Sequence, residues 1–186
     1  MSKNFSTQNE LLLTNLLEFY KENDNLDKML NIINGESAIS LRIIDWFATN
    51  YAKKYYTVYN LTLCEKRLKV YNDYKLKLKA YSKKRFDPFC RWDRINIPYK
   101  EGKLIQTTIG QLNFFKWALE NEIIQYIENN YSLIEKDMNS RNSTAKNRKC
   151  EETSNANKTR KKREELSVSA SKSIKRETVE IVVKFD

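Results

Sequence analysis

The sequence predicts an α+β fold: a mostly α-helical domain with a small β-hairpin, followed by a disordered basic tail that ends in a short strand. Apolar residues recur at helical spacing over most of residues 1–138, two strand-like segments flank a turn at 100–102, and large apolar side chains become scarce beyond 138. We therefore expect a folded domain at 1–138 with a basic central region at 53–103, a disordered tail at 139–177 and a terminal strand at 178–186.

Two helices are expected near the start of the chain. Thr7 and Glu10 have the spacing of a capping box, which predicts a helix from there to about Tyr20. A second helix at residues 26–33 is expected to end at Gly35, because glycine accepts the left-handed conformation that closes a helix.

The next two helices differ in polarity. Residues 39–51 are apolar on nearly all sides, which indicates a buried helix, although alternating apolar residues at its start leave a strand open there. Residues 66–85 are expected to form an amphipathic helix whose narrow aromatic seam packs on the core while lysines cover the remaining surface. The seam consists of Tyr71, Tyr74, Leu78 and Tyr81.

The second half of the domain is expected to contain the hairpin and a long helix. Residues 94–99 and 103–107 flank Lys100-Glu101-Gly102 as the two strands of a β-hairpin. Apolar residues at helical spacing then predict one helix from residue 109 to about 130, opened by a Thr108 cap.

The last residues return to an apolar pattern. Val179, Ile181, Val183 and Phe185 alternate with other residues as in a strand. Such a strand needs a sheet edge, so it is expected either to join the hairpin of its own chain or to mediate self-association in a homo-oligomer.

The composition limits the chemistry. The 186 residues include no histidine, 3 glycines and 3 cysteines, so imidazole-dependent catalysis and a standard four-ligand zinc site are excluded. No apolar run is long enough to span a bilayer, and no secretion signal is recognised, which favours an intracellular, reducing compartment without a membrane partner. We expect no catalytic residues, metal, cofactor or small-molecule substrate.

Positive charge is concentrated in the middle of the chain. Residues 53–103 carry 15 basic and 5 acidic side chains. The net charge of this segment therefore equals the +10 of the whole protein. Few acidic residues are near enough in sequence to pair with these lysines, which favours a surface for the phosphates of nucleic acid over a merely solvated face. The predicted phosphate-binding residues are Lys53, Lys54, Lys66, Arg67, Lys69, Lys75, Lys77, Lys79, Lys83, Lys84, Arg85, Arg91 and Arg94, and in the tail Lys158, Arg160, Lys161, Lys162 and Arg163. The tail cluster could instead serve nuclear import or solubility.

Two catalytic alternatives carry less weight. Asp93 with Glu101-Gly102-Lys103 resembles the acidic pair and lysine of metal-dependent nucleases, but Glu101 falls in a turn and the motif is short. Cys90 has basic neighbours but no imidazole base, so we expect a small buried side chain rather than a nucleophile.

Three segments together resemble a small basic protein of mimivirus-like giant viruses, which belong to the nucleocytoplasmic large DNA viruses. They are residues 40–51 (Ser-Leu-Arg-Ile-Ile-Asp-Trp-Phe-Ala-Thr-Asn-Tyr), 75–91 and 107–118, and the resemblance covers roughly residues 38–130. The function of that family is poorly defined. The resemblance implies a viral protein of the cytoplasmic virus factory or of the virion.

The expected function is non-catalytic, largely sequence-independent nucleic-acid binding, with DNA preferred over RNA and double-stranded DNA favoured as the partner. The expected location is the host cytoplasm at the virus factory, or the virion, rather than the host nucleus. The alternative is a scaffold protein that organises a viral factory or condensate through its terminal strand and charged tail.

Overall fold

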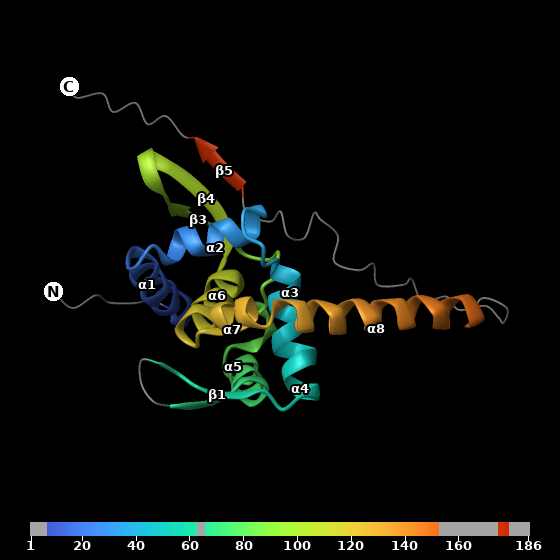
Figure 1. The fold of residues 1–186 in the computed structure, drawn as a ribbon. Helices are drawn as coiled ribbons and strands as arrows, with labels where there is room; N and C mark the ends of the chain where they lie inside the picture. The colour runs from blue at the N-terminus through green and yellow to red at the C-terminus, as the bar shows by residue number, and fades with distance from the viewer. Residues whose placement is uncertain (1–6, 63–65, 153–174, 179–186) are drawn as a thin grey trace, which may run out of the picture.

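The computed structural model describes residues 7–62, 66–152 and 175–178. Helices dominate the described part, and short antiparallel strands complete it, which confirms the predicted fold class (Figure 1). In chain order the elements are α1 (Gln8–Lys21), α2 (Asn25–Asn34), α3 (Leu41–Trp46), the π-helical turn η1 (Phe47–Tyr51), α4 (Ala52–Lys54), β1 (Val58–Asn60), β2 (Arg67–Lys69), α5 (Val70–Arg85), β3 (Arg94–Pro98), the 3-10 turn η2 (Lys100–Gly102), β4 (Lys103–Thr108), α6 (Ile109–Glu120), α7 (Ile123–Asn129), α8 (Tyr131–Glu152) and β5 (Lys175–Thr178).

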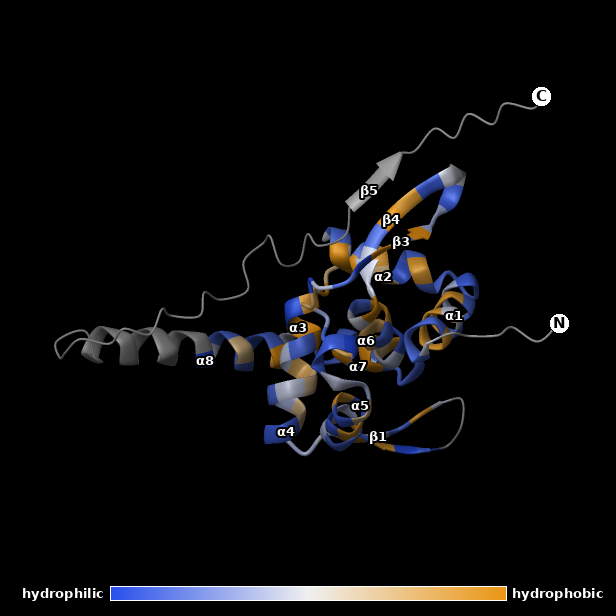
Figure 2. Ribbon diagram, turned by 180° about the vertical axis from the view of Figure 1, so that it is seen from behind, coloured by the Kyte–Doolittle hydropathy of each residue, from blue (hydrophilic) through white to orange (hydrophobic). Residues whose placement is uncertain are grey.

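Helix α6 lies at the centre of the helical body and contacts α1, α5, α7 and β4 (Figures 1 and 2). Its sequence is apolar on nearly every side, and Leu112, Phe114 and Phe115 are completely buried. The Tyr20 hydroxyl of α1 donates a hydrogen bond of 2.6 Å to the backbone oxygen of Leu112. A helix that is apolar all round must be covered by its neighbours, and this requirement arranges the other helices around it.

The strands form two small sheets at opposite ends of this body (Figure 1). β1 and β2 make an antiparallel hairpin beside α5. β3 and β4 make the hairpin predicted from the sequence, with Arg94 opposite Thr108 and Pro98 opposite Leu104. β5 adds to β4 in antiparallel register, so the end of the chain contributes a strand to its own sheet.

Helix ends follow the sequence signals closely. Thr7 and Glu10 form the predicted capping box, in which each side chain accepts a hydrogen bond from the other residue's backbone N–H. Gly35 closes α2 with a left-handed φ of 78°. The Thr108 hydroxyl accepts the backbone N–H of Gln111 at the start of α6.

Several boundaries differ from the sequence prediction. The strand left open at residue 39 is absent, because Ser40 caps α3 through the N–H of Ile43. Residues 67–69 form β2 instead of the first turn of a helix, so α5 begins only at residue 70. The long helix expected at 109–130 is divided where Glu122 takes a left-handed φ of 55°.

The end of the chain also differs in detail. α8 continues to Glu152, past residue 138, and buried Ile134 and Met138 fix its first turns. Pairing in the C-terminal segment occurs at Lys175–Thr178, just before the predicted strand. Residues 153–174 and the self-association residues of the predicted strand lie outside the described residues.

Replacing Gly110 with alanine should destabilise the protein, although alanine is the better helix former by about 1 kcal/mol. A Cβ at this position would lie 3.0 Å from the backbone oxygens of both Lys84 and Asp87, which are fixed by the loop after α5. We expect the free energy of unfolding to fall by about 1–3 kcal/mol, as in an overpacked core. Urea unfolding measures this, with Gln125→Ala on the exposed side of α7 as control; a G110A midpoint at or above the wild-type value would contradict the packing argument.

Candidate nucleic-acid interface

One side of α5 is fixed to the core by aromatic packing. The ring of Tyr74 lies with its centre 5.7 Å from Trp117 of α6, and Phe86 lies at the same distance from Trp117 on another side. The Trp117 indole N–H donates a hydrogen bond of 2.6 Å to the carboxylate of Asp73. Asp73 is therefore committed to holding α5 in place, and the opposite side of the helix is fixed toward solvent.

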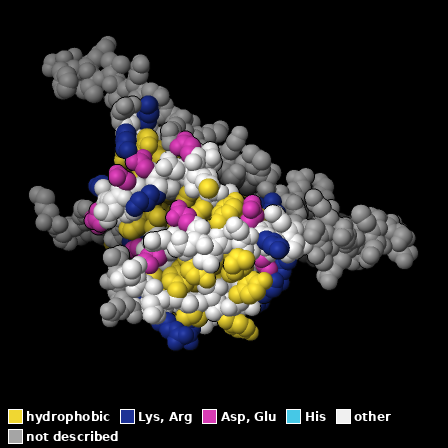
Figure 3. Space-filling model, viewed as in Figure 1, with side chains coloured by type: hydrophobic (Ala, Val, Ile, Leu, Met, Phe, Trp, Pro, Cys, Tyr) yellow, Lys and Arg dark blue, Asp and Glu magenta, His cyan; other side chains and the backbone are white. Residues whose placement is uncertain are grey.

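That outward side carries Lys75, Leu76 and Lys79. Both lysines are exposed, and neither has an acidic partner within the described residues. Figure 3 shows dark-blue basic side chains at the lower rim of the described part, where Figure 1 places α5 and the β1–β2 hairpin. Further dark-blue side chains lie separately toward the left and right of the same view, and magenta acidic side chains lie between them.

The other predicted cations are distributed around α5. Lys66, Arg67 and Lys69 are exposed on or beside the β1–β2 hairpin instead of on the helix. Lys77 and Arg85 are half-buried on the core side, which removes them from the outward face. The predicted cations that are exposed in the described residues are Lys53, Lys54, Lys66, Arg67, Lys69, Lys75, Lys79, Lys83, Lys84, Arg91 and Arg94. The tail cluster at 158–163 lies outside the described residues.

Two of the exposed lysines have carboxylate partners that the sequence did not reveal. Lys83 lies 3.7 Å from Asp87, and Lys84 lies 2.6 Å from Asp93. The Lys84 and Asp93 side chains are 60% and 61% exposed, and such surface pairs contribute only about 0–1 kcal/mol. A phosphate can therefore replace the carboxylate at little cost.

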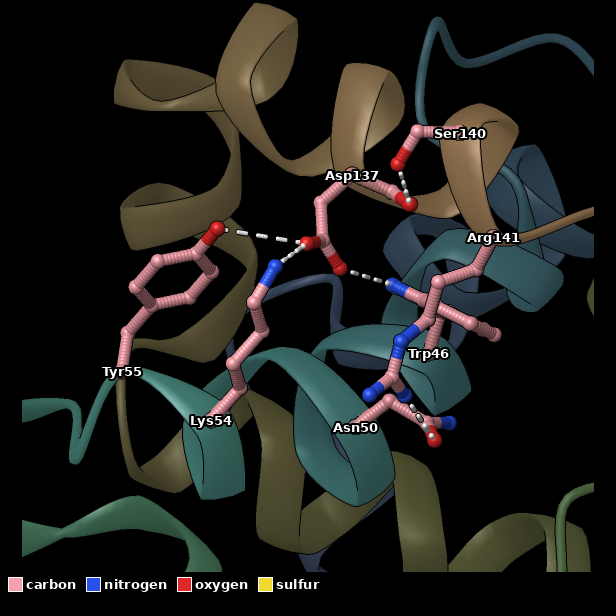
Figure 4. A network of polar contacts seen from close by, with 7 residues as sticks. All are labelled: Trp46, Asn50, Lys54, Tyr55, Asp137, Ser140 and Arg141. Atoms are coloured by element: carbon pink, nitrogen blue, oxygen red, sulfur yellow. Dashed lines mark hydrogen bonds and ion pairs between the residues drawn. The ribbon is translucent and has the colours of Figure 1, made fainter. Parts of the chain in front are cut away.

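Lys54 belongs to a structural network and not to the outward face. Its ammonium lies 2.5 Å from the carboxylate of Asp137 on α8, which also accepts hydrogen bonds from the Trp46 indole and the Tyr55 hydroxyl (Figure 4). Burial acts to raise the pKa of Asp137, but the hydrogen bonds from Lys54 and Trp46 prevail and lower it. Because the side chain of Asp137 is only 4% exposed, breaking its ion pair with Lys54 costs more free energy than breaking the surface pair of Lys84 with Asp93.

The π-helical turn η1 explains how these groups reach one carboxylate. A π-helical turn contains an extra residue, so side chains four residues apart remain aligned along the same side of the helix. Trp46 and Lys54 contact Asp137, and Asn50 between them accepts a hydrogen bond of 3.4 Å from Arg141 (Figure 4). The network thus attaches α8 to the α3–η1–α4 segment from Trp46, at the end of α3, to Lys54, at the end of α4.

Three depressions lie along α5 and the loop after it, and the helix itself is broken at Ser82, which has a left-handed φ of 63°. The first, of about 290 Å³, is lined by Lys53, Tyr56 and Lys69 among others. It shares Tyr71 with the second, of about 670 Å³, whose cations are those of the outward face of α5. The third, of about 720 Å³, is lined by Lys83, Lys84, Asp87, Phe89, Cys90, Arg91 and Trp92. The first two depressions form one groove beside α5, and the third shares no lining residue with them; we call the three together the track along α5.

Two aromatic side chains on this track were missed by the sequence analysis. Tyr56 is 86% exposed and Trp92 is 76% exposed, the two highest values among the large hydrophobic residues described. Trp92 is surrounded in sequence by Arg91, Asp93 and Arg94, and charged residues on both sides are a usable signal of exposure. Tyr56 gives no such signal, because its exposure follows from a left-handed φ of 48°.

The nuclease arrangement is not assembled. Asp93 precedes β3, whereas Glu101 lies in the turn at the other end of the hairpin, separated from it by a five-residue strand of roughly 17 Å. Among the described residues no group of three or more metal-ligating side chains is found. Cys90 is buried as predicted, and its thiol donates to the backbone oxygen of Lys84 at 3.4 Å.

No helix in the described part of the chain is long and apolar enough to cross a membrane.

The fold and this surface define a small, mostly helical protein with a cation-rich face around one helix. The chain matches a family of unknown function, DUF7197, over residues 1–184, and it belongs to that family. It is 46% identical over 133 residues to uncharacterized protein L507 of Acanthamoeba polyphaga mimivirus, which confirms the resemblance to mimivirus-like proteins and supports a viral origin. The match covers 68% of this chain and 51% of the relative, so the chain spans about half of that protein's length. No solved structure matches the chain.

Asp45 should make the stability of the protein depend on pH. Burial, and to a lesser degree Asp87, raises the pKa of this α3 carboxyl from 3.8 to about 6, against the opposing charge of Lys83. A raised pKa means that the fold favours the protonated form, so this contribution to stability is complete below about pH 4 and is lost as the pH rises through 6. Asp45→Asn removes this titration. The free energy of unfolding of the variant minus that of the wild type should therefore be larger at pH 7.5 than at pH 4, by about 1–3 kcal/mol.

Urea unfolding at several pH values measures this gain. Glu36→Gln, at an exposed position, is the matched control for the loss of one carboxylate. A difference between D45N and wild type that stays constant from pH 4 to 7.5 would rule out Asp45 as the titrating group.

Proposed function

We propose that this protein binds nucleic acid, DNA in preference to RNA, without catalysing a reaction on it. The observation that carries the proposal is the pair Lys75 and Lys79: they are exposed on the outward face of α5 and have no acidic partner in the described residues. Each cation that neutralises a phosphate releases condensed counterions, and this drives binding without regard to base sequence. Lys53, Lys69 and Arg91 extend the same track beyond both ends of the helix.

Two kinds of paired cation can be distinguished within the predicted set, beside the unpaired Lys75 and Lys79. Lys54, tied to a buried carboxylate, is expected to contribute to stability and not to binding. Lys83 and Lys84 are expected to exchange weak surface carboxylate partners for phosphate. This distinction separates a binding surface from a general positive charge, since the latter would predict equal effects for every lysine.

The biological setting is part of the proposal. Membership in a family with a mimivirus relative supports action on viral DNA in the virus factory of the host cytoplasm, or in the virion. Self-association through Val179–Phe185, the basis of the scaffold alternative, depends on residues outside the described part of the chain. β5 occupies the free edge of β4 within the same chain, which gives no support to an intermolecular role for that edge.

The double variant K75Q/K79Q should weaken DNA binding and reduce its dependence on salt. Losing two phosphate contacts should lower the slope of log K against log salt by about 1.8 for duplex DNA or about 1.4 for a single strand. Affinity near 0.1 M salt should fall on the order of tenfold or more. Fluorescence anisotropy with labelled random-sequence DNA and the full-length chain measures both quantities.

The matched control is K21Q/K28Q, which removes two exposed lysines from α1 and α2 and leaves the net charge equal to that of the test variant. A third variant replaces Lys158 and Arg160–Arg163 with glutamine, to measure the contribution of the tail. Equal losses in test and control would show that only total charge matters, and loss in the tail variant alone would move the binding site away from α5.

A further inference from the structure

The three depressions along α5 end at each side in an exposed aromatic ring. Tyr56 lies in the depression with Lys53 and Lys69, before the start of α5. Trp92 lies in the depression with Lys83, Lys84 and Arg91, after its end. Within the described residues neither ring has a hydrogen bond, a stacking partner or a cation over its face.

Exposed rings at these positions are not accounted for by the fold. The tyrosines on the inner side of α5 pack against the core, whereas Tyr56 and Trp92 contribute apolar area that remains in contact with water. The chain also holds Tyr56 and Asp93, the residue after Trp92, at left-handed φ values of 48° and 54°. Such values are uncommon for residues other than glycine. The backbone beside these exposed rings is therefore held in a conformation that is not its most favourable one.

Phosphate contacts alone make no use of an aromatic face. The bases of a duplex are stacked on one another, so lysines suffice to bind its outside. A single strand leaves its bases unpaired, and proteins that bind it combine a positively charged groove with aromatic side chains on which bases stack. A cationic groove with an unpartnered ring at each end matches that combination and has the charge complementary to a phosphodiester backbone.

We propose that the track along α5 binds single-stranded nucleic acid, with one base stacked on Trp92 and another on Tyr56. This inference rests on the nucleic-acid binding proposed above and specifies its substrate class. Residues 70–81 of α5, which precede a break in the helix at Ser82, span about 18 Å, or roughly five nucleotides at the spacing of stacked bases. A 15-nucleotide strand is therefore long enough to reach both rings and the lysines between them.

The test compares a 15-nucleotide oligothymidylate with a 15-base-pair duplex, using the full-length chain and fluorescence anisotropy. The wild type should bind the single strand more tightly than the duplex. Trp92→Ala and Tyr56→Ala should each weaken single-strand binding by roughly 5- to 100-fold, the effect of removing one base–aromatic stack. Trp92→Phe should retain most of the affinity, because a ring remains at that position.

A spectroscopic readout separates stacking from attraction between charges. The protein has 3 tryptophans, of which Trp117 is buried and Trp46 is half-buried against Asp137, so Trp92 is the one that a base can cover. Oligothymidylate should quench tryptophan emission in the wild type and in K75Q/K79Q at saturation, but not in Trp92→Phe. Leu133→Ala, which removes a side chain that is 60% exposed on α8, is the control for loss of exposed apolar surface.

Each outcome bears on one proposal or on both. If the alanine variants bind the single strand as the wild type does while K75Q/K79Q binds it weakly, the stacking inference fails and the proposed function stands. Tighter binding of the duplex, without quenching, also overturns the inference alone. If neither nucleic acid binds at low salt, both proposals are wrong.

Discussion

The close contact between the first turn of α6 and the loop after α5 determines the rest of the structure. Gly110 has no side chain, so the backbone oxygens of Lys84 and Asp87 approach the helix to a distance that a Cβ could not tolerate without a shift. This approach brings Phe86 into the aromatic cluster around Trp117, and the same cluster holds Tyr74. α5 is thereby fixed along its inner side at both ends, and its outer side has no alternative orientation. The position of the cations on the surface is a consequence of this packing.

Acidic residues determine which of the many cations remain available. Asp137 is buried and neutralises Lys54, and this ion pair attaches α8 to the α3–η1–α4 segment. Breaking the pair would leave a buried carboxylate without its partner, which is strongly destabilising. Asp73 accepts a hydrogen bond from the Trp117 indole and, within the described residues, forms no ion pair with the lysines of α5. Asp87 and Asp93 lie at the surface, where their ion pairs contribute little to stability and can be exchanged. A chain of high net positive charge thus contains structural, exchangeable and unpaired cations, and only the last two kinds suit a ligand.

The parts of the fold that follow from local rules could be predicted from the sequence. The capping box at Thr7, the left-handed glycine after α2 and the 94–107 hairpin depend on neighbouring residues alone. The start of α5 at residue 70 could not be predicted, because residues 67–69 form β2 only through their pairing with β1. The break at Glu122 follows the Asn121 cap of α6 and is likewise not marked by a glycine or a proline. For the site, the sequence identified the lysines but neither their partners nor the exposed rings, since pairing and exposure arise from tertiary contacts.

The two properties of the track are physically independent and act on different parts of a ligand. Attraction between lysines and phosphates weakens as salt is added, because the gain from releasing counterions shrinks. Stacking of a base on an aromatic ring gains from removing apolar area from water and carries no such dependence. With cations between two exposed rings, the electrostatic part favours any nucleic acid and the rings favour one whose bases are accessible. In the proposed complex, selection of single strands would therefore not require reading the base sequence, and it would persist at salt concentrations that weaken contacts made by phosphates alone.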